Sequence, residues 1–191
     1  EVGKGRAKEL FIAKAREIAR AHAELADALA GKTAIYRADA RQFPLADATV
    51  DLVTTSPPYV GTYDYAAVQE LRAALFQVPL TRTIDAEIGA RRLAFRDPDA
   101  ALDRFHDDLG NVLVEVRRVL RSSGCAVIVV GDSFARERHI DALEVIDDLA
   151  SRVGLHVVAA ATQERAVHFR PMKERVRRHG EHLVLLAKNG T

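Results

Sequence analysis

The sequence predicts an α/β protein whose sheet is mainly parallel and carries an antiparallel pair of strands at its edge. Apolar, β-branched segments alternate along the chain with amphipathic helical segments, which is the order found in α/β folds. The apolar run over 125–130 is unbroken, which is typical of a strand buried on both faces of a helix-covered sheet. The 191 residues suit a single domain over 1–191.

The N-terminal segment, 1–31, is predicted to be an amphipathic helix over about 5–30. Phe11, Ile18 and Leu25 lie seven residues apart on one stripe, and Gly31 is a suitable stop. A short strand is predicted over 33–37. A second strand over 50–55 follows a polar turn.

The middle of the chain is predicted to be mostly helical. A helix is expected to run to Gln77 and to end before Pro79, with Val68, Leu71 and Leu75 facing inward. Residues 80–98 show no clear period and are predicted to form an inserted loop or short helix. Asp99 is predicted to cap a long helix with one apolar stripe, made of Leu102, Phe105, Leu109, Val112, Leu113, Val116 and Leu120.

The C-terminal part supplies the rest of the predicted sheet. A strand is predicted over 125–130, a helix over 140–153 that Gly154 stops, and strands over 155–161 and 182–187. The last two strands are expected to pair antiparallel at the sheet edge.

Composition excludes a membrane protein and a disulfide-stabilised one. The apolar runs are too short to span a bilayer, and the N-terminal residues lack the layout of a signal peptide. Cys125 is the single cysteine, which fits a reducing cytoplasm. We therefore expect a cytoplasmic protein without a membrane partner.

One segment of the chain carries a charge that favours nucleic-acid binding. The net charge of +1 provides no global attraction to nucleic acid, but the stretch 164–179 is rich in basic residues, among them Arg170 and Lys173. This stretch is either a solvated loop or a contact surface for phosphates.

The most informative segment is the end of the strand over 50–55. Pro57 and Pro58 cannot continue a strand ladder, so the chain turns outward as a stiff loop. That loop presents the Ser56 hydroxyl, the Pro57 carbonyl and the Tyr59 ring. The two oxygens can accept the hydrogens of an exocyclic amine, and the aromatic ring can stack on a flat base.

Thr55-Ser56-Pro57-Pro58-Tyr59 resembles the catalytic motif of the S-adenosylmethionine-dependent amino-methyltransferases, and its serine most resembles the N4-cytosine DNA enzymes. The resemblance implies a Rossmann-like methyltransferase sheet, S-adenosylmethionine as cofactor and DNA as partner, as in DNA methylation and restriction-modification. It implies catalysis by Ser56, Pro57, Pro58 and Tyr59. Adenine N6 is an alternative target, and RNA or a protein side chain is an alternative substrate of the same core.

The resemblance extends from Asp39 to Lys188 and implies further site residues. Asp39 matches the acidic position that accepts from the adenine amine of the cofactor, and Ser56 also borders the cofactor. Tyr63 and Tyr65 would join Tyr59 in contacting the target base, or pack on the helix that follows. Arg170 and Lys173 would contact phosphates. Asp132, after a buried strand, would line the cleft or cap the next turn.

The chain departs from the family before Asp39. No strand followed by a glycine-rich cofactor loop precedes this residue, so the sheet is expected to be incomplete at its N-terminal side, with an unpaired strand edge and exposed apolar faces. Three explanations are open. The sequence is a piece of a longer protein, a partner chain supplies the missing strands, or the remaining strands of a reduced relative pair differently.

The histidines do not predict a metal site, and one missing motif leaves a second class of function open. His168, His179 and His182 show no ligand spacing with Cys125, so no metal site is predicted. Because the glycine-rich loop is absent, the alternative to an enzyme is a catalytically incomplete domain that binds nucleic acid or a partner chain.

Overall fold

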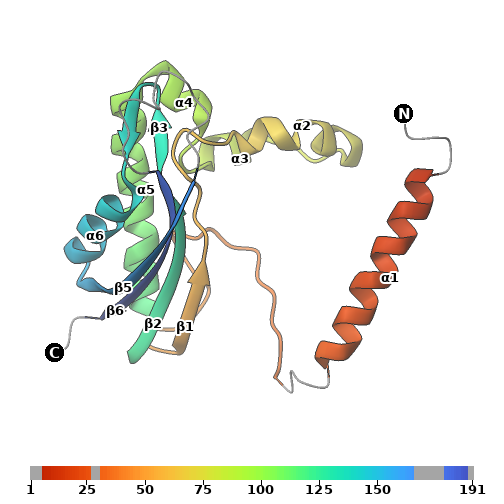
Figure 1. Ribbon diagram of the computed structural model, residues 1–191, viewed down its shortest axis with the longest axis horizontal. Coiled ribbons are helices and arrows are strands. Elements are labelled where there is room, and N and C mark those ends of the chain that lie inside the picture. The colour runs from red at the N-terminus through yellow and green to blue at the C-terminus, as the bar shows by residue number, and fades with distance from the viewer. Residues whose placement is uncertain (1–5, 27–30, 166–178, 189–191) are drawn as a thin grey trace. The chain divides into compact units, whose positions relative to one another are not determined.

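The computed structural model describes residues 6–26, 31–165 and 179–188 (Figure 1). Two compact units are present, Glu1–Arg37 and Ala38–Thr191. The predicted helix in the first unit is confirmed as α1 (Arg6–Ala26). Its apolar stripe is exposed, with Phe11 74% and Ile18 50% accessible.

The strand predicted over 33–37 is wrong. These residues form no strand, and Ile35 is 93% exposed. A short β-branched segment needs a neighbouring strand for its hydrogen bonds, and no described strand pairs with it. Asp39 therefore follows irregular backbone, in an isolated bridge with Gln42.

The second unit contains a four-stranded sheet in the order β1-β2-β6-β5, formed by β1 (Val50–Thr55), β2 (Leu120–Gly131), β6 (Gly180–Lys188) and β5 (Leu155–Glu164). β1 is parallel to β2, and β6 is antiparallel to both β2 and β5. Consequently β1, β2 and β5 share one direction, and the β5–β6 pair occupies one edge. The predicted α/β class, with its mainly parallel sheet and antiparallel edge pair, is confirmed.

One face of this sheet is covered by α5 (Pro98–Val119) and α6 (Ala142–Arg152), as Figure 1 shows. The alternate residues of β2 and β6 that face these helices are buried. The core between the layers contains Leu109, Leu113, Val116, Ile128, Ile146, Val184 and Leu186. The helical stripe expected for α5 is therefore confirmed from Leu102 to Val116, whereas Leu120, which was also expected on it, is the first residue of β2.

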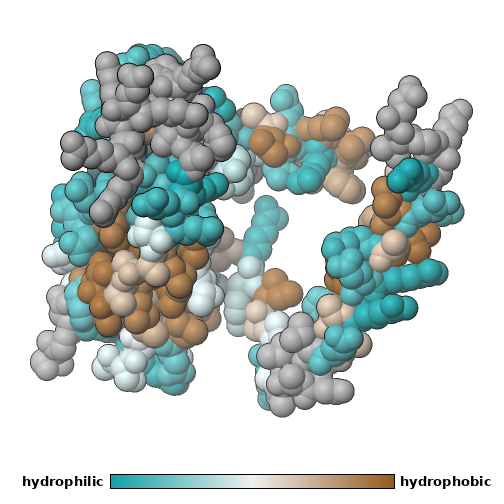
Figure 2. Space-filling model, in the orientation of Figure 1, coloured by the Kyte–Doolittle hydropathy of each residue, from teal (hydrophilic) through white to brown (hydrophobic). Residues whose placement is uncertain are grey.

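The opposite sheet face contradicts the expectation that the run over 125–130 is buried on both sides. Cys125, Val127 and Val129 are only partly buried, and Leu183, the cross-strand partner of Val129, is 50% exposed. Figure 2 shows this face as a hydrophobic patch. Within the described part of 38–191, the helices pack on the other face, so strand residues pointing away from α5 and α6 lack a covering layer. The expected exposed apolar face is thus observed, and β1 lies at the sheet edge with β2 as its partner.

Two helical details differ from expectation. α5 is capped by Asp97 rather than Asp99: the Asp97 carboxylate accepts from the Ala100 N–H at 3.1 Å, and Pro98 occupies the first turn, where its missing N–H costs nothing. In α2 (Tyr65–Phe76), Val68, Leu71 and Leu75 are 62–73% exposed, so the inward orientation predicted for them is wrong. Helical periodicity identifies an apolar stripe but not whether a partner covers it.

Residues 80–98 form two short helices, α3 (Thr81–Ala86) and α4 (Arg91–Arg96). A two-stranded sheet of β3 (Ser133–Ala135) and β4 (Arg138–Ile140) was not predicted, because three-residue strands show no readable alternation. None of the described helices combines the length and apolar character needed to cross a bilayer.

Candidate active site

The Ser56-Pro57-Pro58-Tyr59 loop begins where β1 ends, as its prolines predict. Thr55 pairs with Ile128 of β2, so the loop continues alongside the last residues of β2, at Val130 and Gly131. Ser56 is exposed, Pro57 to Tyr59 are half-buried, and Val60 is buried at 2% accessibility. The chain thus displays the Ser56 hydroxyl while Val60 anchors the far end of the loop. Ligands of open α/β sheets bind outside the carboxyl ends of parallel strands, which is where this loop lies.

The Tyr59 ring is held between Gly131 and Glu181. The ring lies so close to Gly131 that a Cβ there would be 2.6 Å from Tyr59 Cε2. The Tyr59 hydroxyl donates to Glu181 Oε1 at 2.9 Å, and Arg165 Nη1 lies 3.3 Å from the same oxygen. Burial raises the pKa of Tyr59; the Ser56 hydroxyl opposes this rise and Glu181 adds to it. The ring is therefore a neutral, oriented phenol at physiological pH.

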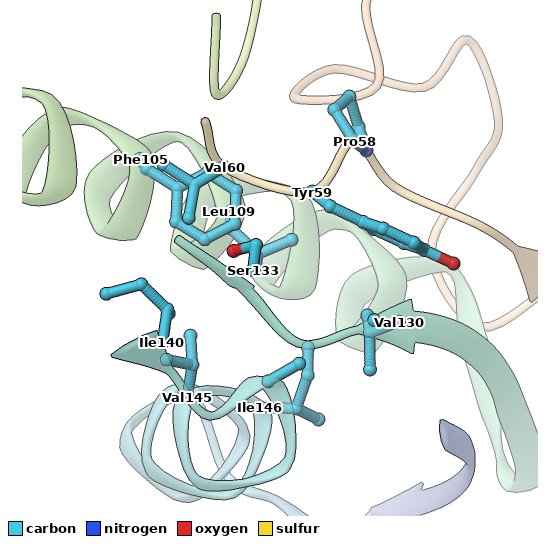
Figure 3. A pocket seen from close by; sticks show the side chains of 12 residues that line it. Pro58, Tyr59, Val60, Phe105, Leu109, Val130, Ser133, Ile140, Val145 and Ile146 are labelled. Atoms are coloured by element: carbon cyan, nitrogen blue, oxygen red, sulfur yellow. The ribbon is translucent and has the colours of Figure 1, made fainter. Parts of the chain in front are cut away.

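An apolar pocket lies beneath the loop (Figure 3). The Tyr59 ring forms part of its wall, while the hydroxyl points away from the apolar residues that Figure 3 labels. The free space is about 20 Å³, which is the room needed by one water molecule. This pocket is therefore part of the packed core that supports Tyr59, and is not a ligand site.

Tyr63 and Tyr65 form an exposed aromatic pair. Their accessibilities are 53% and 43%, and their ring centroids are 5.6 Å apart. Neither ring is buried against α2, so both are available to a ligand. Whether they contact a base stays a prediction.

The backbone of this aromatic loop is fixed by the segment 84–92. Glu87 Oε1 accepts from the Tyr65 N–H at 2.5 Å, and Arg92 pairs with both Glu87 at 2.6 Å and Asp64 at 2.7 Å. Glu87 is buried at 8% accessibility, so this ion pair is partly desolvated and its loss would leave an unpaired buried charge. The segment predicted as an insertion thus braces the loop that carries the two tyrosines.

Asp39, the predicted cofactor residue, is bound by its neighbour Arg41. The Arg41 side chain donates to Asp39 Oδ1 at 3.0 Å and Oδ2 at 2.8 Å, and the Arg41 N–H donates to Oδ1 at 2.9 Å. These hydrogen bonds lower the pKa of Asp39. The side chain is 46% exposed, and each oxygen has lone pairs left, so the carboxylate can still accept from an amine.

Asp132 joins three elements at the end of β2. Its Oδ1 accepts from the Ala142 N–H at 2.9 Å and lies 3.0 Å from His182 Nε2, and its Oδ2 accepts from the Gly180 N–H at 2.7 Å. Burial raises the pKa of this carboxyl, but the hydrogen bonds from Ala142, His182 and Gly180 outweigh it, so the pKa lies below its usual value. Asp132 does not cap the next turn: it accepts from Ala142, ten residues further on, at the start of α6, and the N-cap of α6 is Asp141.

Two functional residues were missed by the sequence reasoning, and two predicted ones cannot be located. Glu181 lies 122 residues from Tyr59 in the chain, and Gly131 gave no local signal of an approaching ring. Arg170 and Lys173, the predicted phosphate contacts, lie outside the described residues.

Comparison with known proteins gives similarity only to solved structures. No protein-family model and no curated protein matches the chain. A provisionally assigned DNA modification methylase from Thermus thermophilus, TTHA0409, in its complex with S-adenosyl-L-methionine, is 24% identical over 80% of this chain and 54% of its own, with a TM-score of 0.48. The selenomethionine form of that protein is 22% identical over 80% of this chain and 51% of its own, with a TM-score of 0.47. The PH0226 protein from Pyrococcus horikoshii is 14% identical over 99% of this chain and 69% of its own, with a TM-score of 0.42.

The chain thus spans about half the length of the methylase structures that it resembles. These TM-scores are all below 0.5.

Proposed function

We propose that this chain belongs to an enzyme that transfers a methyl group from S-adenosylmethionine to an exocyclic amine of a DNA base, with cytosine N4 as the target. The observation that carries the proposal is the loop after β1: an exposed Ser56 hydroxyl and an oriented Tyr59 ring lie together at the carboxyl ends of two parallel strands. The hydroxyl and carbonyl oxygens can accept the hydrogens of an exocyclic amine, and the aromatic ring can stack on the planar base that carries it.

The chain's own residues would act by orienting the amine. The N4 lone pair of cytosine is delocalised into the ring, so the nitrogen is a weak nucleophile. Hydrogen bonds from this amine to Ser56 Oγ and the Pro57 carbonyl would favour a pyramidal nitrogen and direct its lone pair, while Tyr59 stacks on the base. In duplex DNA the base must first leave the stack, and the cost of unstacking would be partly recovered by contact with Tyr59.

S-adenosylmethionine supplies the electrophilic methyl group when it is bound. The residues of this chain that fit it are the exposed carboxylate of Asp39, which can accept from an adenine amine, and Ser56 at the loop start. These two residues provide only part of a nucleoside site, because the sequence contains no glycine-rich loop after a strand.

The experiment is methyl transfer from radiolabelled S-adenosylmethionine to duplex DNA by the protein that carries this sequence, with nucleoside analysis of the product. We expect N4-methylcytosine. If the product is N6-methyladenine, or if only RNA or protein is labelled, cytosine N4 is not the target, but the reaction is still methyl transfer from S-adenosylmethionine. No transfer to any of these substrates would overturn the enzyme itself.

Matched serine variants test the role of the loop. Ser56→Ala is expected to lower kcat by about 10²–10³-fold, as losing a single positioned hydrogen-bonding group does in other enzymes. Ser122→Ala removes an exposed hydroxyl at the opposite end of β2 and is expected to leave kcat unchanged. Equal rates for both variants would refute the assignment of Ser56.

A further inference from the structure

A second cluster of chemically active side chains lies at the end of β2, on residues that the proposed methyl transfer does not use. It brings together Asp132 after β2, His139 of β4 and His179 just before β6. One ligand atom from each residue lies within 4.8 Å of the other two, and Asp132 Oδ2 is 3.9 Å from His139 Nε2. Asp132 and His139 lie seven residues apart, but His179 follows 40 residues after His139, so only the tertiary structure reveals the group.

One ring nitrogen of each histidine in this cluster is buried without a hydrogen-bond partner in the described part of the chain. His139 Nε2 and His179 Nδ1 have almost no accessible surface and no hydrogen-bond partner among the described residues. A buried polar atom without a partner costs about 1–3 kcal/mol, so native structures rarely leave two beside a carboxylate. A bound cation would satisfy both nitrogens at once.

From this geometry we propose that Asp132, His139 and His179 bind a divalent transition-metal ion, with Zn²⁺ as the best fit. Two imidazoles and one carboxylate form a ligand set suited to Zn²⁺, and three protein ligands leave a fourth position for water. In a tetrahedral site with bonds of about 2.0–2.2 Å, neighbouring ligand atoms are about 3.3 Å apart. The separation of 3.9 Å between His139 Nε2 and Asp132 Oδ2 exceeds this by about 0.6 Å, and the other separations, all within 4.8 Å, exceed it by at most about 1.5 Å, a change within reach of side-chain rotation.

The surroundings supply the support that metal ligands need. Hydrogen bonds from Ala142, Gly180 and His182 orient the Asp132 carboxylate, and Thr162 Oγ1 lies 2.9 Å from His182 Nδ1 to orient that ring in turn. Hydrogen bonds of this kind commonly fix the orientation of a side chain that binds a metal ion. Asp132 is therefore held in one orientation before an ion arrives.

The rings of the two histidines are also positioned. Phe134 stacks on His179 at 5.4 Å with an interplanar angle of 18°, and meets His139 edge-on at 5.2 Å. These contacts fix the planes of both imidazoles beside Asp132. A pocket of about 350 Å³ borders Asp132 and His179 and offers an ion a route to them.

A second group, Asp132 with Asp141 and His182, is a weaker candidate. His182 Nε2 is already hydrogen-bonded to Asp132, and the Asp141 carboxylate caps α6 by accepting from Leu143 and Glu144. His182 Nε2 and Asp141 Oδ1 therefore have partners without an ion. This difference makes Asp141 a useful control position.

The test is titration of metal-stripped protein with Co²⁺, followed by visible absorbance, and displacement of the Co²⁺ by Zn²⁺. We expect one ion per chain, intense bands typical of tetrahedral Co²⁺, and a higher thermal midpoint with Zn²⁺. His139→Ala and His179→Ala should each weaken binding by at least about 100-fold. Asp132 is not used as the primary variant, because its loss would also break the contacts to Ala142, Gly180 and His182.

Two controls make the result decisive. Asp141→Asn keeps the helix cap and should bind Co²⁺ normally, and His22→Ala removes an exposed histidine of α1 without effect. The proposal is overturned if the folded protein binds neither Co²⁺ nor Zn²⁺. It is also overturned if the His139→Ala variant and the His179→Ala variant each bind Co²⁺ as tightly as the parent, or if Asp141→Asn abolishes binding. These outcomes are independent of methyl transfer.

Discussion

Replacing Gly131 by alanine tests the contact that holds the Tyr59 ring in the candidate active site. The new Cβ would lie 2.6 Å from Tyr59 Cε2 and 2.9 Å from Cδ2, whereas ordinary contacts begin near 3.4 Å. The ring must therefore move by about 0.8 Å or the strand must shift. Tyr59 cannot yield freely, because its hydroxyl is bound to Glu181 and the ring packs against the core.

The expected cost follows from two opposing effects. Overpacking in a well-packed region costs about 1–3 kcal/mol. Removing a glycine from a strand recovers about 0.5–1 kcal/mol of backbone entropy. We therefore expect Gly131→Ala to lower the free energy of unfolding by about 1–2 kcal/mol, and to lower methyl transfer by on the order of 10²-fold if the ring moves by nearly 1 Å.

The assay is urea denaturation followed by far-ultraviolet circular dichroism. Gly110→Ala is the matched control: its Cβ, inside α5, would meet only Leu149 Cδ2 at 3.9 Å, so this variant should be more stable by about 1 kcal/mol. In a Tyr59→Leu background the penalty of Gly131→Ala should largely disappear, since the clashing ring is gone. The reasoning is refuted if Gly131→Ala is as stable as the parent, or if its penalty is the same in both backgrounds.

Three further predictions concern the second unit, each read out by denaturation. Leu113→Ala leaves a cavity at a fully buried position and should lower the free energy of unfolding by about 2–5 kcal/mol. Leu183→Ala, on the uncovered sheet face, should lower it much less, and equal losses would contradict the core assignment. Asp97→Ala removes the α5 cap and should cost about 1 kcal/mol, and an unchanged midpoint would show that the cap is not stabilising. Hydrogen bonds from Arg118 and the Phe43 N–H lower the pKa of Glu115 to about 2 from 4.5, so the stabilisation it gives is present above pH 4.5 and is lost as pH falls toward 2. Glu115→Gln should be less stable at neutral pH and less pH-dependent between these values; a parallel pH profile of thermal midpoints would disprove this.

Local sequence predicts best the helices and strands that have a clear hydrophobic periodicity or that end at a proline or glycine. β1, α5 and α6 were expected close to their observed positions, because a run of apolar residues or a helical stripe reports directly on burial. The apolar run over 125–130 predicted only the second half of β2, which begins at Leu120. The loop after β1 was expected from Pro57 and Pro58, since proline cannot extend a ladder. Failures occurred where a segment's structure depends on a neighbour, as in the unpaired segment 33–37 and the exposed stripe of α2.

The sequence by itself determined the main strands and helices around the core, the α/β class and the identity of the loop that presents Ser56 and Tyr59. Each of these depends on residues adjacent in the chain. Only the tertiary structure decided that Glu181 and Gly131 hold Tyr59, and that Asp132, His139 and His179 converge. Such groups form where distant strands end at the same sheet edge, and a one-dimensional pattern carries no signal for contacts made across the sheet.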